Sequence, residues 1–213
     1  MDESTGHLHA LILAGGASSR LGQPKQLVKL GGRPALHRVV TNAISAVGQS
    51  VTVVLGAHAQ EITRLLAHSP ASMIVNRHWE EGIASSLRCG LAALPPTCTA
   101  ALILLGDQVA VSTDDLRRLT NAWRTNEDVI AASVYQGHLG VPAIFPQWSV
   151  SELRQLRGDR GARMILERYA HQLTKVHMPS AAVDLDTPED LERLTVQYAK
   201  PGVPDESPAA AND

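Results

Sequence analysis

A glycine-rich segment followed by two basic residues is the part of the chain best suited to chemistry. The segment Leu13-Ala14-Gly15-Gly16 ends an aliphatic run, and Arg20 and Lys25 follow it within ten residues. Paired glycines let backbone N–H groups approach an anion without a Cβ in the way. Arginine offers phosphate a bidentate fork and lysine a point charge. The segment therefore predicts a polyphosphate site in which Arg20 and Lys25 neutralise the ligand.

Two better-known phosphate loops do not fit this spacing. The dinucleotide fingerprint G-x-G-x-x-G fails where Ala17 and Arg20 stand, and a Walker A loop fails because Lys25 follows Pro24 and precedes Gln26. The plain structural alternative is a glycine-rich turn with solvated basic residues. The fixed order of the basic residues after a first strand favours the phosphate site.

Acidic residues supply the complementary half of such a site. Asp107 follows an aliphatic run and Gly106, which places its carboxylate at the carboxyl end of a strand, where ligands of open α/β sheets gather. Mg²⁺ takes oxygen ligands and bridges phosphate oxygens, so we expect Asp107 to anchor Mg²⁺ rather than to cap the next helix, for which Ser112 is better suited. Asp184 and Asp186 lie in an extended segment, so only one of them is expected to face the site.

The elements that must position these residues follow from the hydrophobic pattern. Aliphatic runs without polar alternation are typical of strands covered on both faces, and they occur at 8–14, 51–55, 73–75, 100–105 and 129–133. Helical spacing occurs between them, at 36–43, 62–66, 83–94 and 116–123. Ser112 and Thr187 are suited to cap helices. The pattern predicts a three-layer α/β fold with a mostly parallel central sheet.

The regular alternation of predicted strands and helices ends in the second part of the chain. We expect a single domain over 8–199, with a nucleotide half over 8–133 and an acceptor half over 134–199. In the acceptor half, 142–145 could form an edge strand, and 149–169 two short helices broken at Gly158. Residues 1–7 and 200–213 offer nothing to bury and are expected to be disordered.

Composition limits the partners. A formal net charge of −2 gives no general attraction to nucleic acid or to an anionic membrane, so small molecules are the expected partners. Cys89 and Cys98 form neither a zinc pattern nor a disulfide framework, and no HExxH pair is present. With no leader and no apolar run long enough for a membrane span, the expected location is the cytoplasm.

The ordered motifs resemble a known family. LAGGASSRLGQPK is similar to the LAxGxSxRxGxxK signature of the MobA-like nucleotidyltransferases, and most of all to their molybdenum cofactor cytidylyltransferase branch. Four further segments are similar to motifs of that branch, and the resemblance runs from Leu8 to Leu194. They are Asn76–Arg88, Leu104–Gln108, Gly158–Arg163 and Val183–Asp190.

This resemblance implies a Rossmann-like fold of the nucleotide-diphospho-sugar transferase type and a role for each motif. Arg20, Lys25 and Asp107 would be catalytic, and Asp107 and Asp186 would bind Mg²⁺, although Asp186 could also cap a helix. The nucleotide would contact Leu13, Ala14, Gly15, Gly16, Arg20, Lys25, Asn76, Ser85, Ser86 and Asp107. A serine N-cap is the alternative for Ser85 and Ser86. Asp159, Arg160 and Arg163 would hold a phosphorylated acceptor or, alternatively, form surface salt bridges.

The implied activity is transfer of a nucleotidyl group from an NTP to a phosphorylated acceptor such as molybdopterin, with release of pyrophosphate. CTP is expected ahead of GTP, and a molybdoenzyme or its maturation chaperone could be a partner. The chain departs from the branch at Val141, where the branch carries histidine, and at Gly15-Gly16, which is more similar to the guanylyl-transferring branch. The alternatives are a sugar-1-phosphate nucleotidyltransferase and a non-catalytic nucleotide-binding protein that delivers a cofactor.

Overall fold

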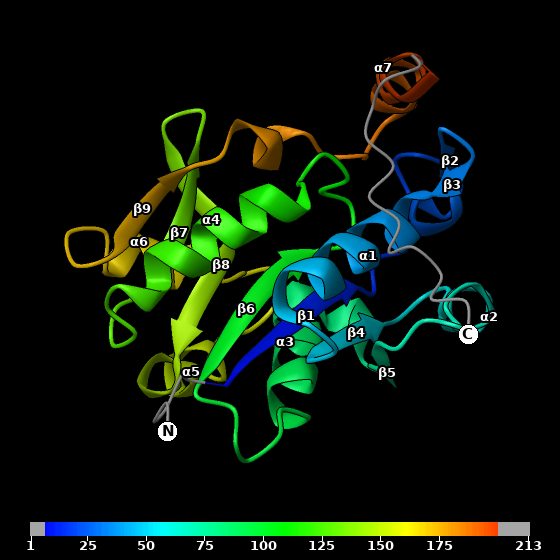
Figure 1. The fold of residues 1–213 in the computed structure, drawn as a ribbon. Helices are drawn as coiled ribbons and strands as arrows, with labels where there is room; N and C mark the ends of the chain where they lie inside the picture. Colours follow the sequence, from blue (N-terminus) through cyan, green and yellow to red (C-terminus); the bar gives the residue numbers. More distant parts are fainter. Residues whose placement is uncertain (1–6, 200–213) are drawn as a thin grey trace, which may run out of the picture.

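A seven-stranded sheet forms the centre of the computed structural model, which describes residues 7–199 (Figure 1). Its strands run in the order β5-β4-β1-β6-β8-β7-β9. Only β8 is antiparallel to its neighbours, so the predicted mostly parallel sheet is confirmed. The strands are β1 (Leu8–Ala14), β4 (Val51–Leu55), β5 (Ser72–Val75), β6 (Ala100–Leu105), β7 (Ala131–Tyr135), β8 (His138–Pro146) and β9 (Thr174–His177). A small hairpin, β2 (Lys29–Leu30) with β3 (Arg33–Pro34), lies outside the sheet.

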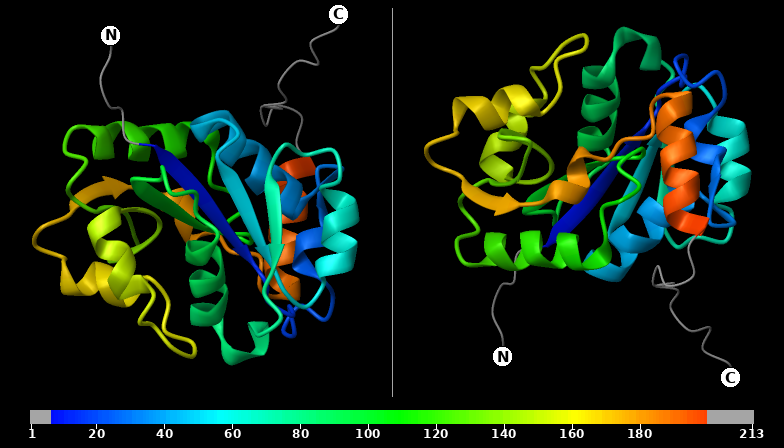
Figure 2. Two further views of the ribbon diagram at one scale, coloured as in Figure 1. Left: turned by 90° about the horizontal axis from the view of Figure 1, so that it is seen from below. Right: turned by 90° about the horizontal axis from the view of Figure 1, so that it is seen from above.

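Helices cover both faces of the sheet, which confirms the predicted three layers (Figure 2). The helices are α1 (Ala35–Val47), α2 (Ala59–Leu65), α3 (Ile83–Ala92), α4 (Thr113–Arg124), α5 (Gln147–Leu153), α6 (Arg163–Arg168) and α7 (Pro188–Ala199). Alternate residues of β1 enter different cores: Ala10 and Ile12 pack with α1 and α4, whereas Leu11 and Leu13 pack with α3. Because successive strand side chains point to opposite faces, one aliphatic strand joins both layers.

Reciprocal caps fix the starts of two helices, as the sequence predicts. The Ser112 hydroxyl accepts a hydrogen bond from the Asp115 N–H, and the Asp115 carboxylate accepts one from the Ser112 N–H. Thr187 and Asp190 form the same pair of bonds ahead of α7. Each of these capping boxes satisfies two backbone donors that would otherwise lack partners at the helix start. The second box holds the segment that carries Asp186.

The prediction of an edge strand at 142–145 is wrong, because β8 pairs with β6 on one side and β7 on the other. Proline was expected only at an edge, since it has no N–H to give to a neighbouring strand. The register shifts between Ala132 and Ser133, and neither Val141 nor Pro142 has a partner residue in it. The missing N–H therefore falls in an irregularity of the ladder. The Ser133 hydroxyl donates to the Pro142 carbonyl at 2.6 Å.

The two predicted halves share the sheet, since the boundary proposed near residue 133 falls inside β7. The predicted disorder of 1–6 and 200–213 lies outside the described residues. His7, which we grouped with the N-terminal tail, accepts a hydrogen bond from the Thr99 N–H through its carbonyl. Between residues 7 and 199, every helix is too short or too polar to span a membrane.

Candidate active site

One lysine lies between two carboxylates at the carboxyl edge of the central strands. The Nζ atom of Lys25 donates to Oδ2 of Asp107 at 2.5 Å and to Oδ1 of Asp186 at 2.7 Å. Arg20 donates to the other oxygen of Asp186 at 3.0 Å. Lys25 begins the short 3-10 helix η1 (Lys25–Leu27), Asp107 follows β6, and Asp186 precedes α7. Folding thus gathers the predicted catalytic and metal-binding residues from three distant segments.

The two cations of this cluster differ in exposure. The Lys25 side chain is 16% exposed, whereas that of Arg20 is 73% exposed. Burial alone would lower the pKa of Lys25, but the charges of Asp107 and Asp186 and their hydrogen bonds outweigh it, so the pKa lies above its ordinary value. Lys25 is therefore a fixed internal cation, and Arg20 is a cation at the rim.

The glycine-rich loop is held by residues to which we assigned no role from the sequence. The buried Gln26 amide donates to the carbonyls of Ala14 at 3.1 Å and Gly16 at 3.2 Å. The Ala57 N–H donates to the Gly15 carbonyl at 3.1 Å. A Cβ on Gly56 would lie 2.3 Å from that carbonyl oxygen, so only glycine fits there. The position of Gln26 directly after Lys25 was a signal that could have identified it.

A cavity of about 360 Å³ opens in front of this loop, which is within the range of small-molecule sites. Many of the predicted nucleotide contacts line it, namely Leu13, Ala14, Gly15, Gly16, Lys25, Ser86 and Asp107. It is also lined by residues without a predicted nucleotide role: Gln26, Trp79, Glu80, Gly82, Ile83, Leu105, Gly106 and Asp159. We call this space the nucleotide cavity. The Trp79 ring, the Glu80 carboxylate and the Ser86 hydroxyl in its lining suit the stacking and edge recognition of a base.

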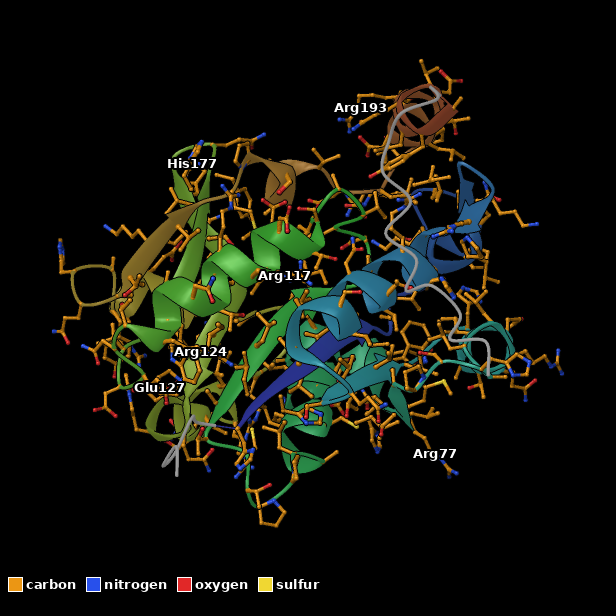
Figure 3. All side chains as sticks on the ribbon, in the orientation of Figure 1. Arg77, Arg117, Arg124, Glu127, His177 and Arg193 are labelled. Carbon is orange, nitrogen blue, oxygen red and sulfur yellow. The ribbon has the colours of Figure 1, made fainter. Side chains whose placement is uncertain are left out.

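Asn76 and Ser85, which we expected to contact the nucleotide, line a different cavity from Ser86. The Asn76 amide donates to the hydroxyls of Ser85 at 2.7 Å and Ser86 at 3.1 Å. Ser85 in turn donates to the His78 carbonyl at 2.6 Å. These bonds fix the turn that presents Ser86 to the cavity. Arg77, which follows Asn76, points away from the molecule (Figure 3).

Asp184 interacts electrostatically with Asp107 and Asp186, and we call these three residues the acidic cluster. That only one of Asp184 and Asp186 faces the site stays a prediction. Burial and, to a smaller extent, the charges of Asp107 and Asp186 together raise the pKa of Asp184 to about 6. The strict alternation of a strand does not apply, because 183–186 lie in no strand. Instead, the Leu185 N–H donates to the Asp107 carbonyl at 3.2 Å, which brings the neighbouring aspartates to Asp107.

The acidic cluster fits a divalent cation that is bound partly by carboxylates and partly by phosphate oxygens. One carboxylate oxygen of Asp107 and one of Asp184 are buried without a hydrogen-bond partner. Within residues 7–199, no group of three or more histidine, cysteine or acidic side chains is arranged as a metal cage. Mg²⁺ commonly uses only one or two carboxylates and completes its shell with water and substrate phosphates. Asp107 and Asp186 are suitable ligands of this kind.

A second cavity of about 190 Å³ adjoins the nucleotide cavity, and we call it the acceptor cavity. Both cavities are lined by Leu13, Ile83 and Leu105. Of the three charged residues expected to hold an acceptor, Arg163 lines the acceptor cavity and Asp159 the nucleotide cavity. Arg163 also forms the surface salt bridge that was the alternative for it, since its Nε donates to Oε1 of Glu167 at 2.8 Å. Arg160 is exposed. The two spaces together can hold two ligands side by side.

Comparison with known proteins gives the same assignment of family. The model of the MobA-like NTP transferase domain matches residues 10–173. The nicotine blue oxidoreductase of Paenarthrobacter nicotinovorans is 30% identical over 86% of this chain and 94% of its own length. The molybdenum cofactor cytidylyltransferase of Escherichia coli K12 is 23% identical, over 91% of this chain and 98% of its own length.

Solved structures agree with this fold. The crystal structure of Rv0371c from Mycobacterium tuberculosis H37Rv has a TM-score of 0.78 and 28% identity, covering 90% of this chain and 99% of its own. Another structure of Rv0371c contains manganese, with a TM-score of 0.75, 26% identity and coverage of 89% and 98%. These structures and the matched domain place the predicted fold type and motifs in a single family. The chain belongs to the family of the MobA-like NTP transferase domain.

Proposed function

We propose that this nucleotidyltransferase moves a nucleotidyl group from an NTP to the phosphate of a small acceptor, releasing pyrophosphate. The observation that carries the proposal is the position of Lys25 between Asp107 and Asp186, at the wall of a cavity that the glycine-rich loop also lines. An acceptor phosphate oxygen attacks the α-phosphorus, and the bond from that phosphorus to the bridging oxygen of pyrophosphate breaks. A phosphate nucleophile is already anionic, so alignment and charge neutralisation are the main demands on the protein.

Each residue of the cluster has a task in this reaction. The backbone of Gly15 and Gly16 lies against the triphosphate, and Lys25 neutralises the charge that develops on it. Arg20, at the rim, holds the outer phosphates. Lys25 exchanges a carboxylate for a phosphate oxygen as the nucleotide enters, and Asp107 and Asp186, which raise its pKa, hold it in the charged form before that exchange.

A divalent cation, Mg²⁺ in our proposal, would be held by Asp107 and Asp186 and would neutralise phosphate oxygens. The buried, unpaired oxygen of Asp107 supports this assignment. The manganese in the structure of Rv0371c supports a divalent metal of this general kind. When the metal is absent, Lys25 supplies the positive charge between the two carboxylates.

CTP is the nucleotide we favour, with GTP second. The short spacing from Gly22 to Lys25 and the similarity to the cytidylyltransferase of Escherichia coli support CTP. The paired glycines at 15 and 16 support GTP. Molybdopterin is the acceptor that this relative suggests, and a molybdoenzyme or its maturation chaperone would then receive the product. We place the reaction in the cytoplasm, consistent with the free thiols of Cys89 and Cys98.

Three alternatives predict different outcomes. A sugar-1-phosphate nucleotidyltransferase would use the same loop and cluster, and a delivery protein would bind the nucleotide without turnover. The oxidoreductase from Paenarthrobacter nicotinovorans also raises the possibility of a redox reaction in the same cavities. The acceptor cavity beside the nucleotide cavity favours an enzyme with two substrates over simple delivery.

The test is pyrophosphate release by the purified chain with each of the four NTPs, with Mg²⁺ or with EDTA. Molybdopterin and glucose 1-phosphate serve as acceptors, and oxidation of NADH or NADPH with nicotine blue as the electron acceptor is followed in a parallel assay. Release that needs metal, an acceptor and CTP or GTP supports the proposal. Nucleotide binding without release under any condition would identify a delivery protein, and oxidation of a nicotinamide cofactor alone would identify an oxidoreductase.

A further inference from the structure

The acceptor cavity is unusual in the chemistry of its walls. The apolar side chains of Leu13, Ile83, Leu87, Ile103, Leu105 and Val141 line it. The polar side chains that reach it are those of Tyr135 and Arg163. The nucleotide cavity next to it is, by contrast, lined by a lysine, a glutamine, a serine and three acidic residues.

The position of the cavity makes it part of the reaction site rather than a separate pocket. It shares Leu13 and Leu105 with the nucleotide cavity, and Leu105 lies two residues before Asp107. Burial and the negative charge of Asp184 raise the pKa of Tyr135, whereas the positive charge of Arg163 lowers it. Because Arg163 lines this cavity and Lys25 lines the nucleotide cavity, a phosphate where the two cavities meet would have one of these cations on each side.

These walls offer few hydrogen-bond partners to a polar acceptor. A sugar or a pterin carries several hydroxyl, amide or ring N–H groups, and each one that is buried without a partner costs about 1–3 kcal/mol. A histidine at position 141 would supply one partner, but this chain has Val141 there. The Gln108 amide donates to the Val141 carbonyl at 2.8 Å and to the Ala181 carbonyl at 2.9 Å, so the backbone holds this apolar side chain in a fixed place.

The size of the space limits the acceptor further. A volume of about 190 Å³ is slightly larger than an apolar cavity of about 150 Å³ that binds benzene. The Tyr135 hydroxyl oxygen lies 2.2 Å from where a Cβ on Gly140 would be, so only glycine at position 140 leaves room for this side chain in the wall. At Gly161 a Cβ would lie 3.7 Å from Ile83, so this wall has room for one more methyl group without a clash.

We infer that the acceptor is a phosphomonoester whose body is a small apolar ring or short branched chain, held by the acceptor cavity with Arg163 on its phosphate. This inference rests on the proposed nucleotidyl transfer, and it replaces molybdopterin, the acceptor that the cytidylyltransferase relative suggests, with an apolar substrate class. Val141 is then a specificity-determining residue, because it replaces a polar contact with an apolar wall.

The experiment uses phenyl phosphate as the probe and glucose 1-phosphate and molybdopterin as the polar comparators. Binding is measured by calorimetry and by methyl NMR of Val141 and Ile83, in the presence of Mg²⁺ and a non-hydrolysable CTP analogue. We expect phenyl phosphate to bind at least about tenfold more tightly than glucose 1-phosphate, in keeping with the selectivity of apolar pockets, and to shift both methyl signals. Equal or weaker binding than either comparator, or no shift at Val141, would overturn the inference.

Two cavity variants are used, so that the test can still be made if one of them does not fold. Val141→His should weaken phenyl phosphate binding about tenfold or more, and Gly161→Ala should do the same by filling the cavity. Val196→His, at a position 63% exposed on α7, is the matched control and should change nothing. If both cavity variants bind the probe as the wild type does, the inference fails. Tight, Val141-dependent binding without pyrophosphate release from CTP would instead count against the proposed reaction while the inferred ligand class stands.

Discussion

The Nζ atom of Lys25 lies 2.5 Å from Oδ2 of Asp107, although 82 residues separate them in the chain. This ion pair stands where the nucleotide cavity meets the acidic cluster, and both side chains are largely buried. Lys25 and Asp107 thus bind each other in the structure, whereas in the proposed reaction each would bind a ligand. The first two predictions remove one member of the pair at a time.

Replacing Lys25 by alanine should lower kcat for pyrophosphate release by about a hundredfold or more, because the charge that develops on the triphosphate loses its nearest buried cation. Lys29→Ala is the matched control, since Lys29 is exposed and lies four residues along the chain. Steady-state kinetics with CTP and Mg²⁺ measure both variants. Unchanged kcat in the Lys25 variant would rule out the role that we give this residue.

Replacing Asp107 by asparagine should keep the shape of the site and remove a charge that the metal needs. We expect kcat to fall about a hundredfold and the affinity for Mn²⁺ in the presence of CTP to fall roughly tenfold or more. Electron paramagnetic resonance of free Mn²⁺ measures the affinity directly. Asp114→Asn, with a side chain 79% exposed on α4, is the control and should bind Mn²⁺ as the wild type does. An Asp107 variant that retains the wild-type Mn²⁺ affinity would place the metal elsewhere.

Asp184 should make the protein more sensitive to pH in the absence of divalent metal. Its pKa is raised from 3.8 to about 6, so the folded chain binds the proton more tightly than the unfolded chain does. This group therefore favours folding at pH below about 4, and that contribution is lost as pH rises through about 6. Asp184→Asn should be more stable than the wild type at pH 7 by about 1–2 kcal/mol, after allowance for solvent screening, and the difference should shrink towards pH 4.

Urea unfolding in EDTA at several pH values between 4 and 7 tests this difference. The comparison of variant with wild type cancels titrating groups that do not interact with Asp184, such as Asp115, whose pKa is lowered by hydrogen bonds despite burial. A constant stability difference across this pH range would contradict the predicted titration of Asp184.

Two glycines near the loop should respond differently to a single methyl group. At Gly56 a Cβ would lie 2.3 Å from the Gly15 oxygen and 2.8 Å from the Trp79 Cβ, so Gly56→Ala should destabilise the fold by about 1–3 kcal/mol and weaken CTP binding. At Gly16 a Cβ would have nothing within 4 Å. Gly16→Ala should therefore change stability by less than about 0.5 kcal/mol and affect only the bound nucleotide. Chemical denaturation and CTP titration separate the two effects, and equal stability of the two variants would refute the close approach at Gly56.

The central strands were predictable because their sequences leave little choice. The predicted bounds of β1, β4 and β6 match the structure, since an aliphatic run buried on both faces is continuous and ends where polar residues begin. The edge strand β9 (Thr174–His177) was not predicted, because it alternates half-buried and exposed residues and contains lysine and histidine. Short edge strands of this kind carry charges that protect the sheet and hide its hydrophobic pattern.

The part of the site that could be predicted consists of residues that directly follow a strand. Asp107 had to lie near the glycine loop, because β1 and β6 are parallel neighbours and their carboxyl ends meet. The contribution of Asp184 was not accessible, since it depends on how an irregular segment lies against Asp107. The use of Asn76 to hold Ser85 rather than a ligand likewise depends on three-dimensional contacts that the spacing of the residues does not encode.

The hydrogen bonds of the Gln108 side chain connect segments that are far apart in the chain. One amide group joins the turn after Asp107 to the backbone of β8 and to Ala181, so the segment that carries Asp107 and the wall that carries Val141 are cross-linked. In the proposed reaction the gap between donor and acceptor would consequently be set when the chain folds, before either substrate arrives. Much of the entropy of bringing two phosphates into line has then already been lost in folding, and less of it opposes the encounter of the substrates.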